Sequence, residues 1–184
     1  MLLEQSRSQL LVIDIQDRLA PHIANINEVV DNSAVLLAAA QRLDIPVTVT
    51  EQYVRGLGPT VEPLQPFIEG VKVFEKLHFS AVADPAIRRH LQQIDQSGGR
   101  NQIVICGIEA HVCVLQTALA LARAGQNVAV VIDAVGSRRT ESLDAARARL
   151  LQNGIEVVTT EMVLFEWLHV AGTDIFKDLS KLIQ

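Results

Sequence analysis

Six short apolar stretches rich in valine and isoleucine alternate along the chain with stretches of helical periodicity. The expected strands are residues 9–14, 46–50, 71–74, 102–106, 127–132 and 155–159. The expected helices are residues 28–43, 84–94, 112–124, 141–152, 161–168 and 174–183. Strands that alternate with helices predict a parallel sheet, because parallel neighbours need a crossover connection that a helix usually provides. The sequence therefore predicts an α/β fold with helices on both faces of the sheet.

Composition supports one domain covering residues 1–184. The chain is 49% hydrophobic, carries a net charge of −5 and has no linker rich in glycine, serine or proline. The acidic balance argues against nucleic acid or an anionic membrane as a partner. The longest apolar run is too short to span a bilayer, and no signal peptide precedes it. Two cysteines do not make a disulfide framework or a zinc site, so a reducing cytoplasm is expected.

The segment 103–114 passes from a strand pattern into a helix pattern. A β-branched run breaks at Gly107, and helical spacing of apolar residues is established by Val112. Cys113 therefore lies near the start of a helix, where free N–H groups and the helix dipole favour a thiolate and can hold an oxyanion. The sequence thus offers a candidate nucleophile with a pKa below about 8.5. The alternative is that this cysteine is a small residue of the core.

Two other reactive side chains follow expected strands. Asp14 ends the first strand and Lys76 follows the third. The carboxyl ends of parallel strands lie on one rim of the sheet, where such folds bind ligands. A carboxylate there can take the proton of a thiol, and an ammonium keeps that carboxylate ionised. Taken singly, each residue has a commoner explanation, Asp14 as a helix cap or turn residue and Lys76 as a surface lysine.

Three motifs resemble those of the isochorismatase-like cysteine hydrolases. They are Leu-Val-Ile-Asp-Ile-Gln (11–16), Glu-Lys-Leu-His-Phe-Ser (75–80) and Gly-Ile-Glu-Ala-His-Val-Cys-Val (107–114). The resemblance covers nearly the whole chain and implies a six-stranded parallel sheet of order 3-2-1-4-5-6. It implies Asp14 as the general base, Lys76 as its partner and Cys113 as the nucleophile.

The resemblance also bears on the turn before Cys113. It implies a cis peptide between Ile108 and Glu109, so that the turn Ile108, Glu109 and Ala110 forms an oxyanion hole with the N–H groups of Glu109 and Cys113. Family members commonly form homo-oligomers, so a dimer or a tetramer is expected. Five residues in the last two helical patterns offer apolar surface for a subunit contact, or else pack on the sheet: Leu164, Phe165, Trp167, Ile175 and Phe176.

The loop after the second strand separates this chain from the nicotinamidases of the superfamily. Those enzymes bind a metal through an Asp-x-His and a further histidine, whereas residues 51–59 contain no histidine. No metal or other cofactor is therefore expected. The loop instead resembles the isochorismatase domain-containing branch, whose substrates are poorly defined. Residues expected to line a pocket for a small-molecule substrate are Gln16, Glu51, Gln52, Tyr53 and Phe79; the alternative is a capped loop with one packed aromatic ring.

The reaction expected from Cys113 is hydrolysis of a C–N bond in an amide or ureide through a covalent thioester. Two alternatives stay open: hydrolysis of a vinyl ether, as in true isochorismatases, and a catalytically idle binding or assembly protein. The turn Ser137-Arg138-Arg139 follows the fifth strand at the same rim. It is interpreted either as a site for an anionic group or as a solvated basic turn.

Overall fold

A single six-stranded parallel sheet forms the centre of the protein, and its order is β3-β2-β1-β4-β5-β6. The computed structural model describes residues 1–183. The strands are β1 Ser8–Ile13, β2 Val47–Gln52, β3 Lys72–Lys76, β4 Gln102–Ile108, β5 Asn127–Gly136 and β6 Glu156–Val158. The class, the number of strands and their order confirm the sequence prediction.

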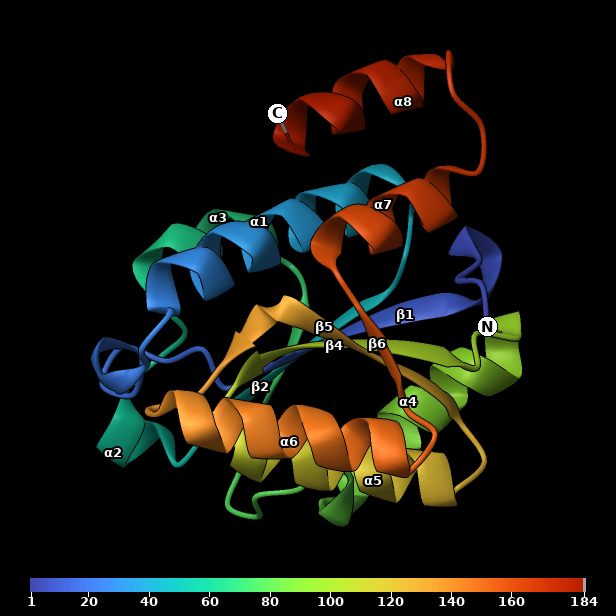
Figure 1. Cartoon of the computed structure of the whole chain (residues 1–184). Helices are drawn as coiled ribbons and strands as arrows, with labels where there is room; N and C mark the ends of the chain where they lie inside the picture. The colour runs from blue at the N-terminus through green and yellow to red at the C-terminus, as the bar shows by residue number, and fades with distance from the viewer. Residues whose placement is uncertain (184) are drawn as a thin grey trace.

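Helices cover both faces of this sheet (Figure 1). The helices α1, α3, α7 and α8 lie on one face, and α4, α5 and α6 lie on the other. Their bounds, with the short helix that follows β2, are α1 Ile26–Arg42, α2 Val54–Leu57, α3 Gln65–Ile68, α4 Pro85–Gly98, α5 Leu115–Arg123, α6 Thr140–Gln152, α7 Thr160–Leu168 and α8 Asp174–Leu179. Within the described residues, no helix has the length and apolar character needed to cross a membrane.

The central strand β1 shows why the sheet is buried on both sides. All six of its residues are buried, and they alternate between two hydrophobic clusters. Leu10 and Val12 join the cluster under α1 and α7, whereas Leu11 and Ile13 join the cluster under α4, α5 and α6. A continuous apolar run is the pattern expected of a strand between two helical layers. This burial holds the end of β1, where Asp14 follows, in a fixed place.

Gly107 does not end the fourth strand, although the sequence suggested a break there. β4 continues through Gly107 to Ile108 and pairs with β5, which itself extends to Gly136. Gly107 has φ +124°, and a Cβ atom at this position would lie 2.0 Å from the carbonyl oxygen of Ile13. Glycine is therefore required at position 107, because β1 and β4 approach each other closely there. With glycine at this position, β4 can continue to Ile108.

The helix that carries Cys113 also begins differently from the prediction. Ala110–Val114 forms a π-helical turn, and regular α-helix starts only at Leu115. Such single π turns occur frequently at functional sites. Asp84 caps α4 as expected, since its side chain accepts a hydrogen bond from the N–H of Ala86. The expected cap Thr140 is instead the first residue of α6.

The five apolar residues near the C-terminus are divided between the core and the surface. Leu164 and Trp167 are buried in the chain's own core, where the indole N–H of Trp167 donates to Ser8 Oγ at 2.9 Å. Phe165 is 44% exposed and packs beside Phe176, with ring centroids 6.3 Å apart. Packing on the sheet therefore accounts for two of the five residues, and Phe165 keeps the most exposed apolar surface of α7 besides Met162.

Candidate active site

Three reactive side chains lie at the carboxyl ends of neighbouring strands. Asp14 follows β1, Lys76 ends β3, and Cys113 lies in the turn after β4. The Lys76 Nζ is 2.6 Å from the Asp14 Oδ2, and both side chains are fully buried. The Cys113 side chain is also buried, and both charged groups lie close enough to perturb its pKa. The structure thus brings together the three residues that the sequence placed on one rim.

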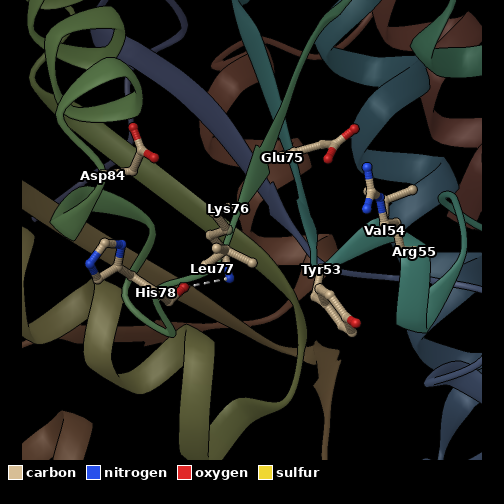
Figure 2. Close-up of a pocket in the computed structure, with 8 residues that line it drawn as sticks. All are labelled: Tyr53, Val54, Arg55, Glu75, Lys76, Leu77, His78 and Asp84. Carbon is tan, nitrogen blue, oxygen red and sulfur yellow. Dashed lines mark hydrogen bonds between the residues drawn. The ribbon is translucent and has the colours of Figure 1, made fainter.

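The ammonium of Lys76 is surrounded by oxygen acceptors. It donates to Asp14 Oδ2 and to Gln52 Oε1, each at 2.6 Å. It also lies within hydrogen-bonding distance of the carbonyl oxygens of His78 and Phe79, at 3.2 and 3.3 Å; Figure 2 shows the contact with His78. An ammonium is buried at an acceptable free energy only when it is paired and hydrogen-bonded in this way. Lys76 is therefore held as a cation whose position is set from several sides.

Asp14 has a donor on each carboxylate oxygen. Thr50 donates its hydroxyl to Oδ1 at 2.7 Å, opposite the Lys76 contact on Oδ2. The backbone of Asp14 is left-handed, with φ +53°, a conformation that aspartate tolerates better than most residues. Sequence reasoning missed Thr50, although a polar residue in the last half of a buried strand is a signal for such a partner. Both carboxylate oxygens of Asp14 are therefore hydrogen-bonded within the protein.

The Cys113 thiol does not have the lowered pKa expected at a helix start. Burial and, to a lesser extent, the nearby Asp14 carboxylate raise the pKa of this thiol, the Lys76 ammonium opposes them, and together they bring the pKa to about 12. Desolvation disfavours a thiolate, and here it outweighs the attraction of one cation that is already shared with a carboxylate. In the free protein the thiol is therefore protonated at neutral pH, with a carboxylate beside it.

The turn before Cys113 is held by contacts to the loop after β5. The peptide bond between Ile108 and Glu109 is cis. Glu109 is buried, and its carboxylate accepts from Arg138 Nε at 2.9 Å and from Arg138 Nη2 at 3.0 Å. Arg138 thus pairs with an anionic group of the protein itself, while its side chain stays 60% exposed, as a solvated basic turn predicts.

Gln16, Gln52 and Glu51 make hydrogen bonds that hold the loop together. Gln16 is fully buried, and its amide exchanges hydrogen bonds with the backbone of Gln52 at 2.9 and 2.7 Å. It also donates to the Gly58 carbonyl at 2.6 Å. Glu51 accepts from both the N–H and the hydroxyl of Thr60. These contacts fit the interpretation as a capped loop, and Gln52 is also a hydrogen-bond partner of Lys76 within the site.

A cavity of about 420 Å³ opens beside the site. It is lined by Tyr53, Val54, Arg55, Glu75, Lys76, Leu77, His78 and Asp84. In Figure 2, His78 and Asp84 lie on one side of Lys76, and Tyr53, Val54 and Arg55 lie on the other. Of the five predicted pocket residues, Tyr53 lines this cavity. Phe79 is exposed to solvent and is not among the residues that line it. Of the three reactive residues, only Lys76 is among those that line this cavity.

A metal site needs several ligand side chains close together in space. Within residues 1–183, no three His, Cys, Asp or Glu side chains come together in an arrangement that suits a metal ion. Both cysteines, Cys106 and Cys113, are free thiols.

Comparisons with known proteins agree with this fold. The sequence model of the isochorismatase domain matches residues 8–162. Isochorismatase domain-containing protein 2 of Danio rerio is 39% identical over 176 residues, covering 96% of this chain and 86% of the relative. The secreted isochorismatase effector Isc1 of Phytophthora sojae is 37% identical over 180 residues, covering 96% and 84%.

A solved structure extends the likeness to three dimensions. The MAR1 ribonuclease of Caenorhabditis elegans has a TM-score of 0.88 and 35% sequence identity, covering all of this chain and 92% of that one. These matches span nearly the whole chain, and the residues matched by the family model, 8–162, cover the positions of all three motifs. The chain belongs to the isochorismatase-domain family.

Proposed function

We propose that this protein is a cysteine hydrolase that cleaves a C–N bond of a small amide or ureide, with Cys113 as the nucleophile. The observation that carries the proposal is the fully buried contact of 2.6 Å between Lys76 and Asp14, next to a thiol whose pKa responds to both. A binding protein has no need to bury an ion pair beside a thiol, because such burial is costly. A hydrolase needs a carboxylate beside the thiol to accept its proton, which is a reason to bury the ion pair there despite the free-energy cost.

In the first half of the proposed reaction, Asp14 takes the proton of the Cys113 thiol as the sulfur attacks the substrate carbonyl carbon. The new S–C bond produces an oxyanion, which we assign to the N–H groups of Glu109 and Cys113 in the turn containing Ile108 and Ala110. Asp14 then returns the proton to the leaving nitrogen, the C–N bond breaks, and the amine departs. A thioester remains on Cys113.

In the second half, Asp14 accepts a proton from a water molecule that attacks the thioester carbonyl. The S–C bond breaks, the carboxylic acid leaves, and the proton returns to the thiol. Lys76 stays charged throughout and keeps Asp14 ionised between transfers. Because the resting thiol has a pKa of about 12, the proton must leave as the sulfur attacks, which makes Asp14 indispensable.

A second candidate is vinyl ether hydrolysis, favoured by the name of the P. sojae relative, an isochorismatase effector. Protonation of an enol ether needs an acid such as Asp14 but no nucleophilic sulfur. The name of the C. elegans relative, a ribonuclease, finds no support in this chain, whose net charge of −5 disfavours a polyanionic substrate.

The test is a screen of small amides, ureides and isochorismate with the wild-type protein, Cys113→Ala and Asp14→Asn. The thioester mechanism predicts that both variants lose turnover, and that mass spectrometry of the wild type finds an acyl adduct on the Cys113 peptide. Cys106→Ala is the matched control, since that thiol is also buried but lies within β4. If Cys113→Ala retains wild-type turnover while Asp14→Asn loses it, acid catalysis on a vinyl ether replaces the thioester mechanism.

The remaining proposals concern cofactors and setting. We propose that hydrolysis proceeds without a metal or an organic cofactor, which elemental analysis of the active protein tests directly. We also propose a homo-oligomer, and a reducing compartment such as the cytoplasm, in which the two free thiols persist.

A further inference from the structure

Two side-chain contacts join the turn that carries Cys113 to the loop 137–139 after β5. Arg138 reaches Glu109 with two nitrogen atoms, Nε to Oε2 at 2.9 Å and Nη2 to Oε1 at 3.0 Å. One residue earlier, Ser137 Oγ lies 3.0 Å from His111 Nδ1. Arg138 and Ser137 are neighbours in the loop. Their partners in the turn, Glu109 and His111, lie four and two positions before Cys113.

The charges make the Arg138 contact more than a surface ion pair. The Glu109 side chain is 7% exposed, whereas that of Arg138 is 60% exposed. All donors that the described part of the chain brings to this carboxylate belong to Arg138, including its backbone N–H at 3.4 Å. Removing Arg138 therefore leaves a buried carboxylate without a counter-charge, which is unfavourable. A bidentate pair also fixes orientation as well as distance.

The loop 137–139 is itself anchored, so it can hold the turn in place. Ser137 is 1% exposed, and its carbonyl oxygen accepts from the N–H of Ala24 at 3.1 Å. Gly136, directly before it, packs so closely that an added Cβ would lie 2.5 Å from the Ile23 side chain. The loop thus rests on the segment before α1 and has little room to move with the turn.

We propose that Arg138 and Ser137 are positioning residues, which hold the Glu109–Val114 turn so that the Cys113 thiol stays beside Asp14 and Lys76. Their use in catalysis rests on the proposed cysteine mechanism. Their effect on the placement of the thiol does not, because it can be measured without a substrate. The proposal gives the basic turn a role that neither anion binding nor plain solvation describes.

The experiment measures how fast iodoacetamide alkylates Cys113 between pH 7 and pH 10, followed by mass spectrometry of the Cys113 peptide. The variants are Arg138→Ala, Arg138→Lys and Ser137→Ala, and Arg139→Ala is the control at an exposed neighbouring residue. A released turn exposes the Cys113 thiol and moves it away from Asp14 and Lys76. The apparent pKa of the thiol should then fall from about 12 toward its ordinary value. We expect about tenfold faster alkylation at pH 8 in Arg138→Ala, which corresponds to about 1.4 kcal/mol.

Lysine keeps the charge but not the bidentate geometry, so Arg138→Lys should recover only part of the wild-type protection. Adding Arg138→Ala to Glu109→Ala should produce no further change, because the residues act through one contact. Circular dichroism confirms that each compared variant is folded. Wild-type alkylation profiles in both Arg138 variants, or additive effects in the double variant, would overturn the proposal. Faster alkylation in a protein that hydrolyses none of the amides would instead overturn the proposed function and leave the positioning role standing.

Discussion

At the scale of single residues, the buried ion pair and the buried thiols determine how the protein responds to substitution. Lys76 and Asp14 form a fully buried pair, so removing one partner leaves the other charge uncompensated. We expect Lys76→Met to abolish hydrolysis and to lower the free energy of unfolding by about 3–5 kcal/mol in urea titrations. Lys181→Met, at an exposed lysine, should change neither. The double variant Asp14→Asn/Lys76→Met should be more stable than Lys76→Met alone; equal or greater loss would contradict the uncompensated-charge argument.

The second prediction at the residue scale concerns alkaline pH. Burial raises the pKa of Cys106 to about 12, and the pKa of Cys113 is raised to the same region. A thiol whose pKa is higher in the folded state contributes stability that is complete below its unfolded pKa of about 8.5 and is lost as pH rises toward 12. We expect the free energy of unfolding to fall above pH 8.5 by at most about 1.4 kcal/mol per pH unit for each thiol. Cys106→Ala should flatten this decline; an unchanged slope would contradict it.

At the scale of elements, the contact between β1 and β4 places Asp14 near the turn that carries Cys113. A Cβ at position 107 would lie 2.0 Å from the Ile13 carbonyl oxygen, so Gly107→Ala must separate the two strands. We expect this variant to lose more than about 4 kcal/mol of stability, or to fail to fold, as measured by thermal and urea unfolding. Gly99→Ala is the matched control, because Gly99 also has a positive φ, +67°, but nothing lies within 4 Å of its added Cβ. It should lose only about 1–2 kcal/mol, and equal losses would exclude the steric explanation.

At the scale of the whole molecule, the expected property is self-association. Phe165 on α7 is 44% exposed, and this helix lies on the same face of the sheet as α1, with α8 farther from the sheet (Figure 1). We expect light scattering at micromolar concentration to give a dimer or a tetramer of the 20.1 kDa chain, and Phe165→Glu to reduce that mass. Leu151→Glu, at a residue of α6 on the opposite face that is 55% exposed, is the control. A wild-type mass of 20.1 kDa would contradict the prediction.

The order of apolar and polar residues by itself determined the architecture. Runs such as 9–14 and 102–106 are buried on both faces, so they leave parallel strands between two helical layers as the arrangement that satisfies them. The same pattern placed Asp14, Lys76 and Cys113 after strands, and parallel strands bring their carboxyl ends to one rim. The helix cap at Asp84 could also be predicted from the sequence, because capping depends on residues that are neighbours along the chain.

Only the tertiary structure decided the partners and the electrostatics of the site. Thr50 and Gln52 come from β2 to contact Asp14 and Lys76, and Arg138 comes from the loop after β5 to pair with Glu109. Such contacts join residues 24 to 36 positions apart, and no local pattern encodes which of them will meet. The pKa of Cys113 was predicted in the wrong direction for the same reason. A helix start is visible in the sequence, whereas the desolvation that raises this pKa to about 12 depends on everything packed around the sulfur.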